Sequence, residues 1–422
     1  MNIVMMTNTF TPHVGGVSRS VTAFTDEFRK AGHDVLVVAP EFDNMPEHER
    51  DVVRVPAIRN FNGSDFSVRI PIPFLLSERL EKFEPDVIHS HHPFLLGDTA
   101  LVVAEDFNIP VVFTHHTMYE QYTHYVPGDS KLMKRFVIEL GTGYANLCDH
   151  VIAPSESIRD ILVQRGVTIP IEVIPTGVDY KHFREGDGNT VRKELGIPQG
   201  HVVIGHLGRL APEKNLEFLS IALVDYMEKN LNTDFVVFGE GPSKDLIKSV
   251  FRHHDMEQRV YFGGVVTGRK VADAYHSMDV FVFASKTETQ GMVLTEAMAS
   301  GVPVIALDAP GAREVVKDRM NGCLVNNESP ADFADALEWV LGRPGSELLQ
   351  LKNYCSELAK EYSIENCAKR CLGLYQKDLT VSPKTERLEG LREITAMIDE
   401  HWKIWLNRMR AFSGAVMNRS GP

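Results

Sequence analysis

Short runs of β-type apolar residues alternate with helical stretches along most of this chain, and this alternation constrains its fold most strongly. The first series of runs lies at Asn2–Thr7, Asp34–Ala39, Asp86–His89, Pro110–Thr114, Asp149–Ala153 and Ile171–Ile174. The second series lies at His201–Gly208, Asp234–Gly239, Arg259–Phe262, Asp279–Ala284 and Pro303–Leu307. A β-α-β-α order favours parallel sheets with helices on both faces and ligands beyond the carboxyl ends of the strands. The sequence therefore predicts an α/β protein with two Rossmann-like domains facing a cleft.

The length of 422 residues is sufficient for two domains with full-sized cores. We expect the first Rossmann-like domain at residues 1–175 and the second at residues 201–365. Residues 176–200 have the polar, Gly-rich composition of a linker. Residues 366–422 are expected to form C-terminal helices, beginning with a helix at Glu365–Gln376.

Composition and charge exclude several classes of protein. The formal net charge of −13 argues against a general nucleic-acid binder, whose surface would be basic. The five cysteines show no paired metal-ligand spacing and, without a signal peptide, indicate reduced thiols in a cytoplasmic protein. No apolar run reaches the length of a transmembrane helix.

The stretch Phe283–Pro303 reads F-A-S-K-T-E-T-Q-G-M-V-L-T-E-A-M-A-S-G-V-P. It predicts the end of a buried strand, a polar loop closing at Gly291, and a helix that begins at Met292. Such a helix entrance presents free backbone N–H groups and the positive end of a helix dipole. A phosphate group could therefore lie on the N–H groups of Met292 and Val293.

Two carboxylates flank this helix entrance, Glu288 in the loop and Glu296 in the helix, with seven residues between them. Ionised carboxylates only accept hydrogen bonds, so they suit the hydroxyl groups of a sugar or a ribose. The alternative is a solvated Glu288 and a Glu296 that stabilises the helix near its positive end.

Two further segments follow the first strand of each series. Arg209 and Lys214 lie just after His201–Gly208, where they could hold an anionic ligand or form a surface salt bridge. Gly15 and Gly16 lie in the predicted loop Phe10–Ser18, where they could let the backbone approach a ligand or only form a tight turn. The helix after this loop is expected at Ser20–Ala31.

Histidines and tyrosines cluster at two strand ends of the first series. The histidines are His89, His91, His92, His115 and His116. No Cys, Asp or Glu completes a metal-ligand spacing with them, so no metal site is predicted. Tyr119 and Tyr122 follow, and they could line an acceptor site or be buried under a loop.

Two amphipathic stretches could contact an anionic membrane surface. One is a predicted helix with Lys131, Lys134 and Arg135 among apolar residues, for which a solvated helix face is the alternative. The other is the C-terminal tail, with apolar residues such as Trp402 and Trp405 at helical spacing and no acidic residue after Glu400. Packing of the tail onto protein remains equally open.

The segment T-E-T-Q-G-M-V-L-T-E-A-M-A-S-G-V-P-V-I resembles the signature of retaining, family-4 type glycosyltransferases with the GT-B fold. The segments G-R-L-x-x-E-K-N, F-G-E-G-P and F-G-G-V-V resemble other segments of that family and occur in the expected order. The resemblance covers roughly Asn2 to Tyr375. In this fold the helix at Glu365–Gln376 crosses back to the first domain.

The resemblance implies a nucleotide-sugar donor, which is a substrate, and no cofactor. It implies that Arg209 and Lys214 bind the diphosphate, that Glu288 binds the donor sugar and that Glu296 binds the ribose. It also implies donor contacts for three further residues, which are Gly16, His116 at the sugar, and Val265 near the nucleobase. The sequence contains no D-x-D, so we expect the leaving diphosphate to be stabilised without a metal.

The segments T-H-H-T-M-Y-E-Q-Y-T-H-Y and S-K-T-E-T-Q-G resemble diacylglycerol glucosyltransferases. This resemblance implies transfer of glucose from UDP-glucose to a membrane lipid such as 1,2-diacylglycerol, by a protein peripheral to the inner face of the membrane. Another nucleotide-sugar such as GDP-mannose, with a soluble sugar or inositol acceptor, remains the alternative. A catalytically silent nucleotide-sugar-binding or scaffold protein is a third, disfavoured because Arg209, Lys214, Glu288 and Glu296 are all present.

Overall fold

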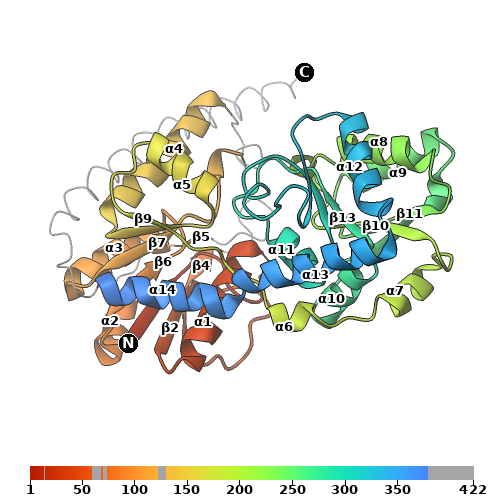
Figure 1. Ribbon diagram of the computed structural model, residues 1–422. Coiled ribbons are helices and arrows are strands. Elements are labelled where there is room, and N and C mark those ends of the chain that lie inside the picture. The colour runs from red at the N-terminus through yellow and green to blue at the C-terminus, as the bar shows by residue number, and fades with distance from the viewer. Residues whose placement is uncertain (14, 59–67, 70–73, 122–129, 379–422) are drawn as a thin grey trace, which may run out of the picture. The chain divides into compact units, whose positions relative to one another are not determined.

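The structure is a computed structural model of the chain (Figure 1). It describes residues 1–13, 15–58, 68–69, 74–121 and 130–378. The chain divides into two compact units. Unit 1 consists of Met1–Ile174 and Ala368–Pro422, and unit 2 consists of Pro175–Cys367.

The described part of unit 1 is built on a seven-stranded parallel sheet with the strand order β3-β2-β1-β6-β7-β8-β9. The strands are β1 (Asn2–Met6), β2 (Asp34–Pro40), β3 (Val52–Val55), β6 (Val87–Ser90), β7 (Val111–Thr114), β8 (His150–Ala153) and β9 (Ile171–Val173). A separate antiparallel pair joins β4 (Ala57–Ile58) and β5 (Val68–Arg69). The helices are α1 (Gly16–Lys30), α2 (Phe74–Phe83), α3 (Leu96–Phe107), the 3-10 helix η2 (Tyr119–Gln121), α4 (Lys131–Leu147) and α5 (Glu156–Gln164).

Helix α14 (Ile364–Asp378) brings the last described residues of the chain into unit 1 (Figure 1). Its Tyr375 is fully buried, with its ring 5.6 Å from that of Phe28 in α1. The phenol oxygen of Tyr375 lies 2.5 Å from Nδ1 of His89, at the end of β6. The C-terminal helix therefore contacts the strand end that carries the first histidine cluster.

Unit 2 contains a six-stranded parallel sheet with the order β12-β11-β10-β13-β14-β15. The strands are β10 (Val202–Leu207), β11 (Thr233–Phe238), β12 (Val260–Gly264), β13 (Val280–Phe283), β14 (Val304–Leu307) and β15 (Gly322–Val325). The helices are α6 (Tyr180–Phe183), α7 (Gly188–Leu195), η4 (Pro212–Lys214), α8 (Leu216–Met227), α9 (Lys244–His253), η5 (Glu257–Arg259), α10 (Arg269–His276), α11 (Met292–Ala299), α12 (Pro330–Leu341) and α13 (Gly345–Glu361).

One buried cluster of unit 2 includes side chains of α8, α9 and α12, and the other includes side chains of α10, α11 and α13. Successive residues of β13 alternate between the two clusters, with Val280 and Val282 in the first and Phe281 and Phe283 in the second. This alternation is what a parallel strand buried on both faces requires. The strand order reverses between β10 and β13, and ligands of open α/β sheets bind beyond the carboxyl ends of the strands at such a point.

The predicted strands are confirmed with shifts of one or two residues at their ends, whereas β3, β4, β5 and β15 were not predicted. Helix α1 begins at Gly16, four residues before the expected start, because Gly15 occupies the cap position in an extended conformation. The predicted loop Phe10–Ser18 therefore ends earlier than expected.

The segment expected to be a linker, residues 176–200, contains regular structure in its middle part. Helices α6 and α7 lie there, with the side chains of Asp179 and Asp187 accepting from the first-turn N–H groups. Gly188 packs so closely that a Cβ on it would lie 2.0 Å from the carbonyl oxygen of His276. The polar, Gly-rich composition of this segment thus comes from helix caps and close packing.

Candidate functional site

Three glycines let the loops at the carboxyl ends of β10, β11 and β12 pack directly on one another. A Cβ on Gly239 would lie 1.9 Å from the carbonyl oxygen of Gly208, and Gly239 has a φ of +129°. The N–H of Gly239 donates to the carbonyl oxygen of Gly264 over 2.7 Å. At the edge of the sheet next to the β10–β13 reversal, the backbones of these loops therefore pack too closely to leave room for side chains.

Lys214 and Glu288 form an ion pair at this edge. Lys214 ends η4 after β10, Glu288 lies in the loop after β13, and the ammonium group contacts Oε1 of the carboxylate. Both side chains are about one-fifth exposed, at 18% and 20%. The hydroxyl of Ser285 donates to the same Oε1 over 3.2 Å. The structure thus brings together a cation and a carboxylate that the sequence analysis assigned to diphosphate and sugar.

Arg209 is held by a second ion pair. Its guanidinium contacts Oε1 of Glu213, whose side chain is 6% exposed, while the Arg209 side chain remains 52% exposed. The single hydroxyl proton of Ser285 is shared between Oε1 of Glu288 and the carbonyl oxygen of Glu213, which lies 3.1 Å from the hydroxyl, and this connects the two ion pairs. The predicted alternative of a salt bridge is therefore present, and it leaves half of the Arg209 side chain accessible.

The Gly291 turn lies beside Glu288. Gly291 caps α11 with a φ of +71°, and a Cβ on it would lie 3.0 Å from the carbonyl oxygen of Gly311. A Cβ on Gly311 would in turn lie 2.9 Å from Cβ of Glu288. Met292 and Val293 follow as the first two residues of α11, where backbone N–H groups have no acceptor within the helix. The positive end of α11 is thus adjacent to the loop that carries the Lys214–Glu288 pair.

Glu296 differs from Glu288 in its surroundings. Its side chain is buried, with the residue 3% exposed, and the hydroxyl of Tyr275 in α10 donates to its Oε2 over 2.8 Å. A ligand hydroxyl would therefore find Glu288 more accessible than Glu296 in this conformation. Tyr275 was missed by the sequence analysis, since a buried aromatic on a helix face gives no sign of a hydrogen-bond partner.

Val265 directly follows β12 and is 68% exposed, at the same edge of the sheet as the Gly239 loop. An exposed apolar residue at this position is compatible with the expected backbone contact to a nucleobase.

His206, at the carboxyl end of β10, was also missed. Its Nδ1 lies 3.1 Å from the carbonyl oxygen of Val282 in β13, and its ring stacks against that of Phe281 with centroids 6.0 Å apart. Within the part of the chain that is described, its buried Nε2 has no hydrogen-bond partner. Burial lowers the pKa of His206 to about 4, so the ring is neutral at pH 7. His206 thus fills the space between the two strands where the strand order reverses.

Gly15 and Gly16 lie at the start of α1 in unit 1. Gly15 has a φ of −161°, and a Cβ on it would lie 3.1 Å from Nε2 of His13. No atom lies within 4 Å of a Cβ placed on Gly16. The open space at Gly16 would admit a ligand, whereas the space at Gly15 is already taken by His13.

The two adjacent histidines after β7 have different environments. His116 is half-buried, and its Nε2 lies 2.9 Å from Nδ1 of His91. His115 is buried, and neither of its ring nitrogens has a partner among the described residues. His116 is therefore the more accessible of the two, and it is the histidine that the resemblance assigns to the donor sugar.

Burial keeps the whole histidine cluster neutral. It lowers the pKa of His89 and His92 to about 3 and that of His115 to about 4. The pKa values of His91 and His116 are lowered well below 6.5, first by burial and then by the neighbouring histidines. Among the described residues, no group of three or more His, Cys, Asp or Glu is arranged to hold a metal ion.

Tyr119 begins η2 and packs edge-on against Phe94 and His115, with ring centroids 5.3 and 6.3 Å apart. Burial raises the pKa of its phenol. This position is closer to the predicted buried role than to an open acceptor site. Tyr122 and the C-terminal tail beyond residue 378 lie outside the described residues.

The first half of α4 combines exposed charged residues with half-buried apolar ones. Its exposed residues are Lys131, Leu132, Lys134, Arg135 and Glu139, and Met133, Phe136, Val137 and Ile138 are half-buried. The amphipathic surface expected from the sequence is therefore present. Over the described ranges, no helix has both the length and the apolar character needed to cross a membrane.

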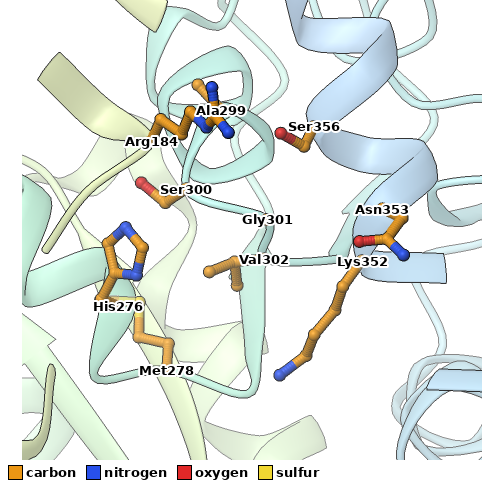
Figure 2. A pocket seen from close by; sticks show the side chains of 10 residues that line it. All are labelled: Arg184, His276, Met278, Ala299, Ser300, Gly301, Val302, Lys352, Asn353 and Ser356. Carbon is orange, nitrogen blue, oxygen red and sulfur yellow. The ribbon is translucent and has the colours of Figure 1, made fainter. Parts of the chain in front are cut away.

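A cavity of about 300 Å³ lies at the opposite edge of the unit 2 sheet (Figure 2). Its lining includes Met278 and Val302, which precede β13 and β14, whereas Glu288 and Gly311 follow these strands. Arg184 and Lys352 lie on opposite sides of it in Figure 2, so their charges do not converge on one point. Helices α6, α10 and α11 all end there, and their negative ends are balanced by these cations. We therefore place the candidate site at the other edge.

Known proteins resemble the chain over most of its length. Residues 14–182 match the family model described as Glycosyltransferase Family 4, and residues 187–362 match Glycosyl transferases group 1. A protein of Streptococcus pneumoniae named alpha-monoglucosyldiacylglycerol synthase is 31% identical over 389 residues, covering 89% of this chain and 85% of the relative. A protein of Corynebacterium glutamicum named GDP-mannose-dependent alpha-mannosyltransferase is 29% identical over 354 residues, covering 81% of each chain.

Solved structures share the fold. The crystal structure of Anabaena HepE in complex with UDP superposes with a TM-score of 0.71 and 19% identity, covering 89% of this chain and 100% of the other. At this identity the likeness concerns the fold alone. It confirms the predicted GT-B class of two Rossmann-like domains.

Proposed function

The chain belongs to the family-4 glycosyltransferases, and we propose that it transfers a hexose from a nucleotide-sugar to an acceptor hydroxyl with retention of anomeric configuration. The proposed donor is UDP-glucose and the proposed acceptor is a membrane lipid such as 1,2-diacylglycerol. The observation that carries the proposal is the Lys214–Glu288 pair beside the N-terminus of α11. One loop system there offers a cation, a carboxylate and free N–H groups.

The charge of the leaving group determines the role of the cationic groups in the site. Transfer of the sugar leaves negative charge on the departing nucleoside diphosphate, which preorganised donors stabilise. We assign this role to Lys214, the exposed part of Arg209, and the N–H groups of Met292 and Val293. Because the sequence has no D-x-D, we propose that these protein groups neutralise the diphosphate without a divalent ion.

The sugar hydroxyls are recognised by side chains that accept hydrogen bonds. Glu288 accepts hydrogen bonds from the hydroxyls of the donor sugar once Lys214 turns to the diphosphate. His116 contacts the same sugar, and Glu296 is the proposed ribose ligand. The burial of Glu296 and its bond to Tyr275 imply that its side chain must exchange partners to reach a ribose.

Two observations favour a lipid acceptor. The relative in Streptococcus pneumoniae is named alpha-monoglucosyldiacylglycerol synthase. The first half of α4 exposes Lys131, Leu132 and Lys134, a combination that suits adsorption to an anionic bilayer surface. We therefore propose that the protein acts in the cytoplasm, peripherally bound to the inner face of the membrane.

A second candidate is transfer of mannose from GDP-mannose to a soluble sugar or inositol acceptor. It is favoured by the 29% identity to a relative named GDP-mannose-dependent alpha-mannosyltransferase. The same carboxylates would accept hydrogen bonds from mannose hydroxyls, so the geometry of Glu288 favours neither sugar.

The test is a panel that crosses two donors with three acceptor conditions. UDP-glucose and GDP-mannose are each incubated with diacylglycerol in mixed micelles, with inositol phosphate, and without acceptor, in buffer containing a chelator. We expect an α-glucosyl lipid, identified by NMR of its anomeric proton, from UDP-glucose and diacylglycerol alone. Turnover only with soluble acceptors rejects the lipid assignment, an inverted anomer rejects retention, and activity abolished by the chelator rejects metal independence.

Glu288→Gln serves as the control for contaminating activities. A chain that binds nucleotide-sugars but transfers sugar to none of the acceptors would instead be a silent binding protein. Binding without turnover in the wild type would therefore reject the transferase proposal.

A further inference from the structure

We propose that His91 is a positioning residue that fixes the ring tautomer of His116, so that His116 presents an Nδ1–H donor. The inference that this N–H group binds the sugar of the nucleotide-sugar rests on the proposed function. The tautomer itself is a property of unit 1 and can be tested separately.

The geometry of the pair is a direct ring-to-ring hydrogen bond. Nδ1 of His91 lies 2.9 Å from Nε2 of His116, and the two rings are inclined by 26°. His91 is 1% exposed, so water does not compete for this bond. His116 lies closer to the surface and is half-buried. The inner ring can therefore orient the outer one.

The His91 ring is itself held in place. The ring of His89 lies against it with a centroid distance of 4.1 Å. His89 is anchored on both nitrogens, by the hydroxyl of Thr114 at 2.6 Å and that of Tyr375 at 2.5 Å. Rotation of the His91 ring would break its bond to His116 and disturb its contact with the His89 ring. The orientation of His91 is consequently fixed by packing as well as by hydrogen bonding.

Two neutral arrangements of the pair are compatible with the distance. In the first, Nδ1–H of His91 donates to Nε2 of His116, and His116 carries its proton on Nδ1. In the second, Nε2–H of His116 donates to Nδ1 of His91, and His91 carries its proton on Nε2. The two arrangements therefore present opposite groups at Nδ1 of His116, a donor in the first and an acceptor in the second.

The buried Nε2 of His91 decides between them. Over the described residues this atom has no hydrogen-bond partner. In the second arrangement it would be a buried N–H without an acceptor, which is the rarer and costlier defect in proteins. In the first arrangement it is only a bare acceptor. The first arrangement is therefore the stable one, and it makes His116 an Nδ1–H donor.

Protonation does not disturb this assignment at neutral pH. Adding a proton to the pair would place an N–H on the buried Nε2 of His91 and a charge among His89, His92 and His115. The lowered pKa values of His91 and His116 agree with this cost. The pair thus works as a neutral donor of fixed direction, suited to the oxygen of a sugar hydroxyl.

The test compares His91→Asn with His91→Leu. The side-chain amide of asparagine can place an N–H where Nδ1–H of histidine was, whereas leucine has no donor. We expect His91→Leu to lower kcat/KM for the nucleotide-sugar by about tenfold, the equivalent of one hydrogen bond in the transition state. His91→Asn should recover most of this loss. Equal losses in two folded variants would overturn the proposal.

Nitrogen NMR of histidine-labelled protein gives the second readout. We expect His116, assigned by its disappearance in His116→Asn, to carry its proton on Nδ1 in the wild type and in His91→Asn, and to lose this preference in His91→Leu. His92→Leu is the control, because His92 is buried nearby but bonds to the N–H of Asn8 rather than to His116. An Nε2–H tautomer of His116 in the wild type would overturn the proposal. Failure of the transferase assay alone would reject the proposed function and leave the tautomer assignment standing.

Discussion

The ammonium group of Lys214 is bound to the carboxylate of Glu288, a residue 74 positions later in the chain. In this structure the two groups therefore satisfy each other. The proposed reaction needs them apart, since Lys214 binds the diphosphate and Glu288 the sugar hydroxyls. Donor binding would then be an exchange of partners, in which each group trades an internal contact for one to the ligand.

If donor binding is such an exchange, substitution of Glu288 and substitution of Lys214 should have opposite effects on UDP binding. Glu288→Gln should lower kcat by about a hundredfold, because it removes a charged sugar ligand, yet UDP should bind at least as tightly because Lys214 is released. Lys214→Met should weaken UDP binding by about tenfold or more, since it removes a cation and leaves the carboxylate of Glu288 unpaired beside the diphosphate. Titration calorimetry with UDP and with GDP measures the two binding effects, and initial rates of sugar transfer measure the change in kcat.

The double variant Lys214→Met/Glu288→Gln tests the coupling itself. It should bind UDP more tightly than Lys214→Met alone, because the repelling carboxylate is gone. The neighbouring pair Lys286–Glu328 is more exposed and provides a matched control in Lys286→Met and Glu328→Gln. Simple additivity of the Lys214 and Glu288 effects would show that the ion pair plays no part in binding.

Sequence patterns were sufficient for the parts of the site that depend on one segment. The start of α11 could be predicted because Gly291 stands between a β-type run and helix formers. The placement of Lys214 near Glu288 could be expected only in outline, since parallel strands end at one edge of a sheet. Their direct pairing depends on side-chain positions that no spacing encodes.

The contacts that sequence reasoning missed all join different elements. Tyr275 and Glu296 belong to α10 and α11, and the His91–His116 bond joins the segments that follow β6 and β7. The helices within residues 176–200 were not predicted, for a related reason. Caps and close-packed glycines have the composition of a linker, and only the packing of α6 and α7 distinguishes them.

Gly291 should be irreplaceable for two separable reasons. Its φ of +71° is costly for any residue with a Cβ, and that Cβ would lie 2.8 Å from Cδ1 of Leu294 and 3.0 Å from the carbonyl oxygen of Gly311. Gly291→Ala should therefore lose about 1–2 kcal/mol of stability from the backbone conformation, and more from the contacts.

Gly196→Ala isolates the first of these costs. Gly196 has a φ of +75°, but nothing lies within 4 Å of its Cβ position. Urea unfolding should show a larger loss for Gly291→Ala than for Gly196→Ala, and only the former should weaken UDP binding. Equal losses of stability would mean that the loops around Gly291 rearrange around the added methyl group at little cost in free energy.

Acid should destabilise the protein from about pH 6.5 downward. The folded protein holds His89 and His92 at pKa values of about 3 and His115 and His206 at about 4, below the usual 6.5. Between these values the unfolded chain binds protons that the folded chain does not. Stability is thus fully present above pH 6.5 and is lost as the pH falls toward 4, by about 1.4 kcal/mol per histidine at pH 5.5.

One carboxyl group opposes this trend, because burial raises the pKa of Asp98 to about 6 and its ionisation cost is relieved by acid. Urea midpoints at pH 7.5, 6.5 and 5.5 measure the net effect. His92→Asn removes one titrating ring while keeping an acceptor for the N–H of Asn8. It should therefore reduce the slope of the free energy of unfolding against pH by the contribution of about one proton. A pH-independent midpoint would contradict the burial of neutral histidines.

The exposed half of α4 should contribute to binding of anionic vesicles. Each cation near such a surface is worth about 1 kcal/mol, so the triple variant Lys131→Gln/Lys134→Gln/Arg135→Gln should bind phosphatidylglycerol vesicles about a hundredfold more weakly. Sedimentation of the full chain with vesicles measures this, and added salt should weaken wild-type binding because the attraction is screened.

The matched control removes three exposed cations from unit 2, in Lys229→Gln/Lys270→Gln/Arg252→Gln. Each triple variant includes one arginine that pairs with a glutamate, Arg135 with Glu139 and Arg252 with Glu257. The two proteins therefore have the same net charge and the same tail, and they differ only in where the cations are lost. Equal weakening in both would assign vesicle binding to overall charge or to the tail, and would remove α4 from the membrane contact.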